Sequence, residues 1–170
     1  FNHSLLKSHY MSKVLTILIC ALAMATAGTA QISTPAPSPT AELELTIGLT
    51  EFELNYSRPS MKDRTIFAAD GLVPYGKIWR TGANDATTIE FDRDIKFGGK
   101  DVDAGTYAIY TIPNEEEWTV MLYSDLELGG YVANYDESNE VLRTTVDATQ
   151  VDVTFETFTI GFGDLRAESA

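Results

Sequence analysis

Cysteine and histidine are almost absent from this chain of 170 residues. The sequence contains one cysteine, Cys20, and two histidines, His3 and His9, and all three precede residue 31. Residues 31–170 therefore provide no thiolate and no imidazole, which excludes disulfides, cysteine nucleophiles, a Ser-His-Asp triad and zinc sites built on histidine or cysteine. No catalytic residue, no metal site and no cofactor is predicted for this part of the chain.

Basic residues are also scarce. The chain carries 12 Lys and Arg against 25 Asp and Glu, a formal net charge of −13. A chain this acidic repels polyanions, so no nucleic-acid partner is expected and binding to anionic membranes is disfavoured. The exception is the locally basic stretch 58–80, which contains Arg58, Lys62, Arg64, Lys77 and Arg80 against Asp63 and Asp70.

Long apolar runs are limited to one, Val14–Ala27. This run is shorter than the roughly 20 residues that span a bilayer. Lys13 precedes it and small residues follow it up to Ala30, which is the pattern of an export signal cleaved after that alanine. We therefore expect residues 1–10 to be upstream translated sequence and residues 11–30 to be a signal peptide. No transmembrane anchor is expected after cleavage, and the expected location is periplasmic or extracellular.

The rest of the chain divides into a short linker and one domain. Residues 31–40 are rich in Pro, Ser and Thr without apolar periodicity, so they are predicted to form an extended linker. From residue 41 onward apolar and polar residues alternate, first in Glu42–Ile47 and then in Glu51–Tyr56, as in half-buried β-strands. Residues 41–170 are long enough for a single domain with its own hydrophobic core.

Further strands are expected at 87–91, 95–97, 100–102, 106–112, 118–123, 141–146 and 151–162. The strands 106–112 and 118–123 are apolar on both faces, which is typical of central strands covered on both sides. In 151–162 the alternation changes phase near Glu156, which indicates a bulge or a change of sheet.

This pattern predicts an all-β fold, a single antiparallel β-sandwich of jelly-roll-like type. One long structured loop is expected over residues 58–82, with at most short helices. These are a helical turn from Val73 to Trp79 and a short helix within 124–139. A closed β-barrel is the alternative.

Five sequence words lie in order along the domain: YSRPSMKDR (56–64), LVPYGKIWRTGANDATTIEF (72–91), GGKDVDAGTYAIYTIP (98–113), EWTV (117–120) and ETFTIGF (156–162). In these words the chain resembles a bacterial secreted family catalogued as domain of unknown function 2911, which occurs mainly in Bacteroidetes-like bacteria. The resemblance covers essentially the whole domain. It implies one more apolar strand, so this copy is expected to lack its last strand. It implies no catalytic residues, and Asp63 stands where the family usually has glycine.

The candidate ligand-binding residues are basic, aromatic and amide side chains: Arg58, Lys62, Arg64, Tyr75, Trp79, Arg80 and Asn84. Guanidinium groups present forked donors to carboxylates, and aromatic faces stack against sugar or peptide groups. The expected ligand is therefore a small anion, a sugar or a peptide. The alternative is structural: the arginines tie the long loop to strand carboxylates, and Tyr75 and Trp79 close the end of the sandwich.

Acidic residues alternate at strand spacing in three places: Asp92 and Asp94, Asp101 and Asp103, and Asp125 and Glu127. They lack the spaced ladder and closing Glu of a calcium loop, so they are interpreted as solvated faces of hairpins. Together these features predict a non-catalytic binding or envelope-associated module. The alternative is a hydrolase or lyase that acts on carbohydrate or peptide through Asp, Glu, Arg and Tyr. The sequence specifies neither the ligand nor the oligomeric state.

Overall fold

The computed structural model describes residues 34–166 and, nearer the N-terminus, residues 10–11, 13 and 16. The contacts divide the chain into two compact units, residues 1–35 and residues 36–170. The predicted signal peptide and the residues before it lie outside the described part, apart from those four positions. Among the described residues, no helix has the length and apolarity needed to cross a bilayer.

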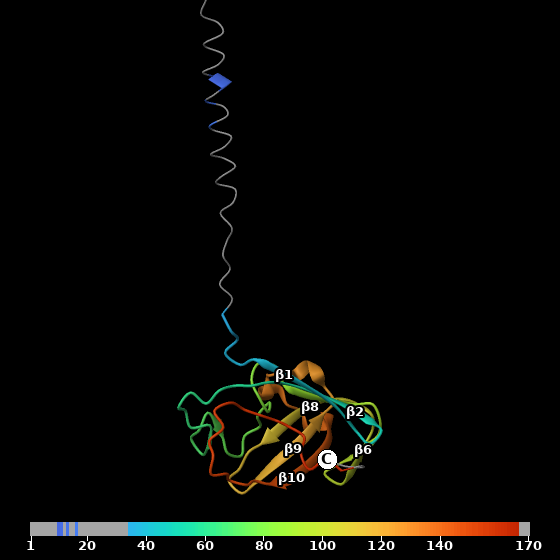
Figure 1. The fold of residues 1–170 in the computed structure, drawn as a ribbon. Helices are drawn as coiled ribbons and strands as arrows, with labels where there is room; N and C mark the ends of the chain where they lie inside the picture. Colours follow the sequence, from blue (N-terminus) through green and yellow to red (C-terminus); the bar gives the residue numbers. More distant parts are fainter. Residues whose placement is uncertain (1–9, 12, 14–15, 17–33, 167–170) are drawn as a thin grey trace, which may run out of the picture. The chain divides into compact units, whose positions relative to one another are not determined.

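The second unit is built on one six-stranded sheet (Figure 1). Its strands are β1 (Thr40–Ile47), β2 (Thr50–Ser57), β5 (Thr87–Phe91), β8 (Gly105–Ile112), β9 (Glu117–Tyr123) and β10 (Glu140–Asp147). They lie in the order β1-β2-β5-β8-β9-β10, and each neighbouring pair is antiparallel. Within the described residues the edge strands β1 and β10 do not pair with each other. The predicted all-β antiparallel fold is therefore confirmed, and the closed barrel is not the fold.

The small elements complete the unit. They are the parallel pair β3 (Phe67–Ala68) and β4 (Val73–Pro74), the antiparallel pair β6 (Ile95–Phe97) and β7 (Lys100–Val102), and three 3-10 helices, η1 (Leu126–Leu128), η2 (Val132–Asn134) and η3 (Glu137–Asn139). Gly98 and Gly99 connect β6 to β7 with φ values of 55° and 79°, which glycine adopts without a Cβ clash. The predicted hairpin, the long loop and short helical structure within 124–139 are present.

Apolar side chains cover both faces of the central strands β8 and β9, which makes the fold sandwich-like. On one face Ile109 and Leu122 pack with residues of β2, β5, hairpin β6–β7 and the C-terminal segment, residues 151–166. On the other face Tyr110 and Met121 pack with residues around η1 and the long loop. Because successive residues of a strand point to opposite faces, β8 and β9 contribute to both cores. The prediction of central strands covered twice is confirmed.

The predicted strand 151–162 does not form. Residues 151–155 are exposed, and the backbone of the segment makes one isolated bridge, between Thr157 and Ser60. Side chains hold the segment instead, because Phe158, Ile160 and Phe162 are half-buried and pack against the core of the sheet. The change of phase near Glu156 thus marks the point where a fully exposed run gives way to alternating half-buried and exposed residues. No strand pairing continues across this point.

The predicted helical turn from Val73 to Trp79 is also wrong. The Val73 N–H donates to the Ile66 carbonyl, 2.9 Å away, as part of the β3–β4 pair. Trp79 exchanges both backbone hydrogen bonds with Thr111 of β8, at 2.7 and 2.9 Å. Within the stretch, the Lys77 N–H donates to the Pro74 carbonyl at 3.3 Å, which closes a single turn and no helix. The N–H groups of Tyr75 and Gly76 donate instead to the carbonyls of Ala68 and Pro113.

Candidate functional site

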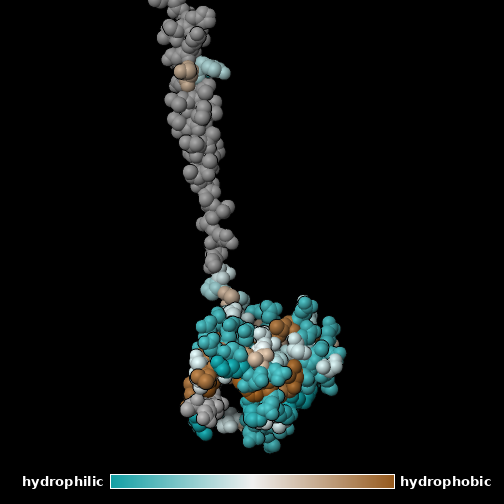
Figure 2. All heavy atoms as spheres, turned by 90° about the vertical axis from the view of Figure 1, so that its right-hand side faces the viewer, coloured by the Kyte–Doolittle hydropathy of each residue, from teal (hydrophilic) through white to brown (hydrophobic). Residues whose placement is uncertain are grey.

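The long loop after β2 and the C-terminal segment enclose a hollow of about 1200 Å³. Its lining residues come from 59–83 and 155–159, together with Ser38. Most of the lining is apolar. Its charged and aromatic side chains are Asp63, Arg64, Phe67, Trp79, Arg80, Phe155 and Phe158. Elsewhere on the molecule, the face shown in Figure 2 is mostly hydrophilic with separate hydrophobic patches.

Four aromatic rings form the framework of the hollow. Phe67 of β3 packs edge-to-face against Trp79 and Trp118, with ring centroids 5.4 and 4.8 Å apart. Trp79 also meets Phe158 of the C-terminal segment at 5.0 Å. Each such pair adds about 0.5–1.5 kcal/mol beyond area burial. The cluster joins the loop, β9 and the C-terminal segment, and Trp79 is fixed further because its indole Nε1 donates to the Gly82 carbonyl at 3.1 Å.

Three of the seven predicted site residues line the hollow, namely Arg64, Trp79 and Arg80. The other four, Arg58, Lys62, Tyr75 and Asn84, do not line it.

Arg58 holds the C-terminal segment in place. Its Nε donates to the Phe158 carbonyl at 3.1 Å, and its Nη2 donates to Thr159 Oγ1 at 2.9 Å. Its guanidinium therefore ties two segments together, but through a carbonyl and a hydroxyl rather than through strand carboxylates.

Asn84 is exposed and has a left-handed backbone (φ 59°), and its Nδ2 donates to Ser57 Oγ at 3.1 Å. Tyr75 is half-buried, and its backbone N–H donates to the Ala68 carbonyl at 3.1 Å.

Lys62, Asp63 and Arg64 form an exposed turn at the rim of the hollow. Lys62 and Asp63 adopt left-handed backbone with φ of 50° and 57°, a region that suits glycine best and that Asp tolerates. Arg64 donates from Nε to the Met61 carbonyl at 2.8 Å and from Nη2 to the Ser60 carbonyl at 2.7 Å. Two of its donors are therefore used to hold the turn.

Arg80 differs from the other arginines of the loop. Its side chain is half-buried and lines the hollow, yet none of the described residues forms a hydrogen bond or ion pair with its guanidinium. Its Nε is fully buried and has no partner. A buried donor left unsatisfied costs about 1–3 kcal/mol. In a chain with 25 acidic residues, an unpaired arginine is therefore a feature that needs an explanation.

Gly130 holds the Arg80 side chain against the wall of the hollow. A Cβ placed on Gly130 would lie 2.5 Å from the Asn84 carbonyl oxygen and 3.3 Å from Arg80 Cδ. The backbone before η2 therefore lies directly on the stem of Arg80, and only glycine permits this approach. Sequence reasoning missed Gly130, Phe155 and Phe158 because they lie outside the basic stretch 58–80, in regions predicted as an acidic excursion and a strand. It also missed Phe67, which lies in that stretch but stands apart from its charged residues.

Carboxylates do not face each other across the hollow. Asp63 is the only Asp or Glu among the described residues that line it. The functional groups of the site are thus the unpaired guanidinium of Arg80, the guanidinium of Arg64 with two donors already bonded, the carboxylate of Asp63 and an aromatic wall. This set can bind an anion but offers no acid–base pair.

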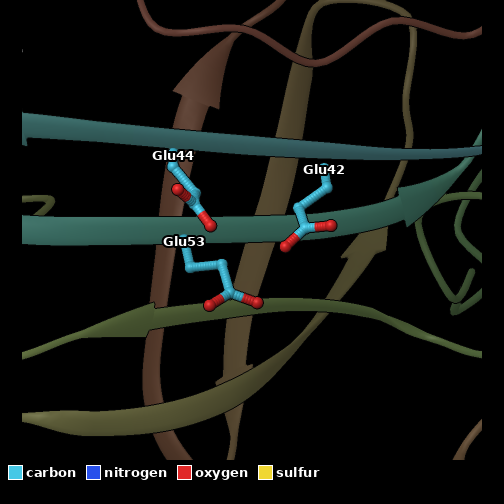
Figure 3. A group of neighbouring side chains, drawn as sticks. All are labelled: Glu42, Glu44 and Glu53. Carbon is cyan, nitrogen blue, oxygen red and sulfur yellow. The ribbon is translucent and has the colours of Figure 1, made fainter.

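A separate acidic group lies on the outer face of β1 and β2 (Figure 3). Carboxylate oxygens of Glu42, Glu44 and Glu53 lie within 4.8 Å of one another, and Glu44 is directly opposite Glu53 in the sheet register. Glu42 and Glu44 are exposed, and Glu53 accepts a hydrogen bond from Asn55 Nδ2. Calcium takes six to eight oxygen ligands. Three carboxylates open to water form an acidic surface, and nothing else at this place points to an ion.

Some of the acidic residues interpreted as hairpin faces accept hydrogen bonds from backbone N–H groups, in a turn, across strands or at a helix start. Asp94 accepts from the Ala104 N–H at 2.9 Å, Asp92 accepts from the Glu51 N–H at 2.9 Å, and Asp125 caps η1 by accepting from the Glu127 N–H at 2.9 Å. All three are exposed, which agrees with that interpretation.

A model of the protein family described as "Protein of unknown function (DUF2911)" matches residues 38–170. Searches of curated proteins and of solved structures found no match. The match covers the six-stranded sheet, the long loop and both sides of the hollow. The chain therefore belongs to the DUF2911 family.

Proposed function

We propose that this domain is a non-catalytic binding module that takes a small anionic ligand in the hollow, with Arg80 as the group that binds the anion. The observation that carries the proposal is the Arg80 guanidinium, which lines the hollow without any partner among the described residues. Burying part of an arginine without a counter-charge destabilises the empty protein, and an anion in the hollow would supply the missing charge.

The surroundings of Arg80 strengthen such an interaction. Hydrogen bonds to an ionised donor are stronger where water is partly excluded, and a guanidinium binds carboxylates through two parallel bonds. The stem of Arg80 lies against Gly130 and its neighbour Trp79 is fixed by Thr111 and Gly82, so little side-chain freedom is left to lose on binding.

Binding is favoured over catalysis by the composition of the lining. The described residues 34–166 contain no histidine and no cysteine, and Asp63 is the single carboxylate in the hollow. A hydrolase or lyase would need a second side chain that takes or gives a proton, and the described lining offers no second carboxylate, histidine or cysteine for this role. We also propose, from the pattern of residues 11–30, that the protein is exported and meets its ligand in the periplasm or outside the cell.

A thermal-shift screen tests this function. The protein is melted with sulfate, carboxylates, uronic acids and short peptides, and in parallel with Arg80→Met and with the control Arg93→Met. Arg93 is exposed and does not line the hollow, so its substitution changes the net charge by the same amount without removing a lining side chain. Free ligand at 100 times its Kd stabilises by about 2.7 kcal/mol. An upward shift in the wild type and in Arg93→Met, but not in Arg80→Met, is expected. If no anion raises the melting temperature, the function is rejected.

A further inference from the structure

We infer that the ligand is an organic monoanion whose carboxylate is carried on an aromatic body. The inference rests on the proposed function and names the class of ligand for the same hollow. Two sources share this chemistry, a free aromatic acid and the aromatic C-terminal residue of a peptide, and the experiment below separates them.

The charges in the hollow select one negative charge. Three ionised side chains line it, Arg64, Arg80 and Asp63, which together carry one net positive charge. Arg64 already donates from two of its nitrogens to backbone carbonyls, whereas Arg80 makes no such bond. One anionic group therefore completes the site, and a second would meet the Asp63 carboxylate at the rim.

An unpaired aromatic ring selects the body of the ligand. Phe155 lines the hollow, is 66% exposed, and makes no ring contact with the described residues. The other three lining rings, Phe67, Trp79 and Phe158, are already packed edge-to-face. The hollow thus offers one free ring as well as one free guanidinium, and a ligand with a ring and a carboxylate satisfies both.

The remaining lining agrees with an apolar body. Met61, Ile66, Leu72 and Val73 are aliphatic, and Leu72 is exposed although it faces this hollow. A neutral sugar would leave the guanidinium without a counter-charge and would place its hydroxyl groups against these side chains. The volume of about 1200 Å³ exceeds the usual 300–1,000 Å³ of small-molecule pockets, so the C-terminal residues of a peptide also fit.

Quenching of tryptophan fluorescence provides the assay. The chain has two tryptophans, and Trp79 lines the hollow with its ring 6.3 Å from that of Trp118. The probes are 3-phenylpropionate, its uncharged amide, propionate, sulfate, and the peptide acetyl-Gly-Phe with a free or an amidated C-terminus. Each probe is titrated into the wild type, Arg80→Met, Arg80→Lys, Phe155→Ala and two controls, Arg93→Met and Val153→Ala. Val153 is exposed in the same segment as Phe155 but does not line the hollow.

The expected result is a joint dependence on charge and ring. The free carboxylates bind at least about tenfold more tightly than their amides, and Arg80→Met removes that difference while Arg80→Lys retains part of it. Phe155→Ala weakens the aromatic carboxylates roughly two- to tenfold and leaves propionate unchanged. Both controls behave like the wild type. Binding of phenylpropionate identifies a free acid as sufficient, and binding of the peptide acid alone identifies a peptide C-terminus; each supports the inference.

Two outcomes would overturn it, and they are distinguishable. If propionate or sulfate binds as tightly as phenylpropionate and depends on Arg80, the aromatic class is wrong while the proposed function stands. If no anion binds, or if binding ignores Arg80, both are wrong. Melting curves of every variant, recorded alongside, show that loss of binding is not loss of fold.

Discussion

Substituting Arg80 by Met should leave the free energy of unfolding unchanged or raise it, whereas substituting Arg58 by Met should lower it. The two residues are arginines of the same loop, and the substitutions change the net charge equally, so long-range electrostatics cancel in the comparison. Methionine keeps most of the stem that lies against Gly130. It removes the buried Nε that has no partner, and with it a penalty of about 1–3 kcal/mol.

Arg58 provides the opposite case. Its side chain donates two hydrogen bonds to the C-terminal segment, at 3.1 and 2.9 Å, and each contributes about 1 kcal/mol net. Losing them also leaves the Phe158 carbonyl without this donor. We expect Arg58→Met to be destabilised by about 2–3 kcal/mol, which corresponds to roughly 5–10 °C in melting temperature for a domain of this size.

Urea unfolding without ligand, followed by tryptophan fluorescence, measures both variants. The slopes of the linear extrapolation should match that of the wild type, so that midpoints report stability directly. A loss of 2 kcal/mol or more in Arg80→Met, equal to that in Arg58→Met, would refute the reasoning. In that case the Arg80 guanidinium has a structural partner in solution, and the hollow does not hold a free cation.

Two further predictions concern Gly130 beside the hollow and Tyr110 in the apolar cluster with Met121. Gly130→Ala should lower stability and shift Arg80, because the new Cβ would stand 2.5 Å from the Asn84 backbone carbonyl; Gly161→Ala, where a Cβ meets nothing within 4 Å, is its matched control in urea unfolding and ligand titration. An unchanged urea midpoint in Gly130→Ala would show that the backbone at Gly130 is not in close contact with the Asn84 carbonyl. Burial raises the pKa of Tyr110 to about 12, and its hydroxyl donates to the Gly129 carbonyl at 2.7 Å. Because the pKa of Tyr110 is higher in the folded protein than its ordinary value, the protonated hydroxyl stabilises the fold. This stabilisation is complete below pH 10.0 and is lost as pH rises from there toward about 12. Tyr110→Phe should be less stable at neutral pH yet lose less stability over that alkaline window, and parallel pH profiles of the two proteins would contradict the buried hydroxyl.

The sequence by itself determined the strands of the sheet and excluded several classes of catalysis from residues 31–170. Alternation in Glu42–Ile47 and Glu51–Tyr56 gives strands β1 and β2, since a period of two places every apolar residue on one face. The runs 106–112 and 118–123, which are apolar on both strand faces, predicted the interior strands β8 and β9. The lack of His and Cys after residue 30 excluded whole classes of catalysis before any geometry was known.

Only the tertiary structure decided what happens to residues 151–162. Their alternation correctly indicated burial of Phe158, Ile160 and Phe162, but it predicted a strand that is absent. Alternation reports which side chains are buried and carries no information on whether the backbone has a neighbour to pair with. Here the neighbour is the turn around Ser60, which offers a single bridge.

The tertiary structure also decided which arginine of the loop is free. Arg58 and Arg80 have the same side chain and both lie in the locally basic stretch 58–80, so neither could be preferred from composition. Folding brings the Phe158 carbonyl to Arg58 and the bare backbone of Gly130 to Arg80. Hydrogen-bond partners of a long side chain come from segments distant in sequence, about 100 residues for Arg58, and that is why the unpaired guanidinium in the hollow could be recognised only in three dimensions.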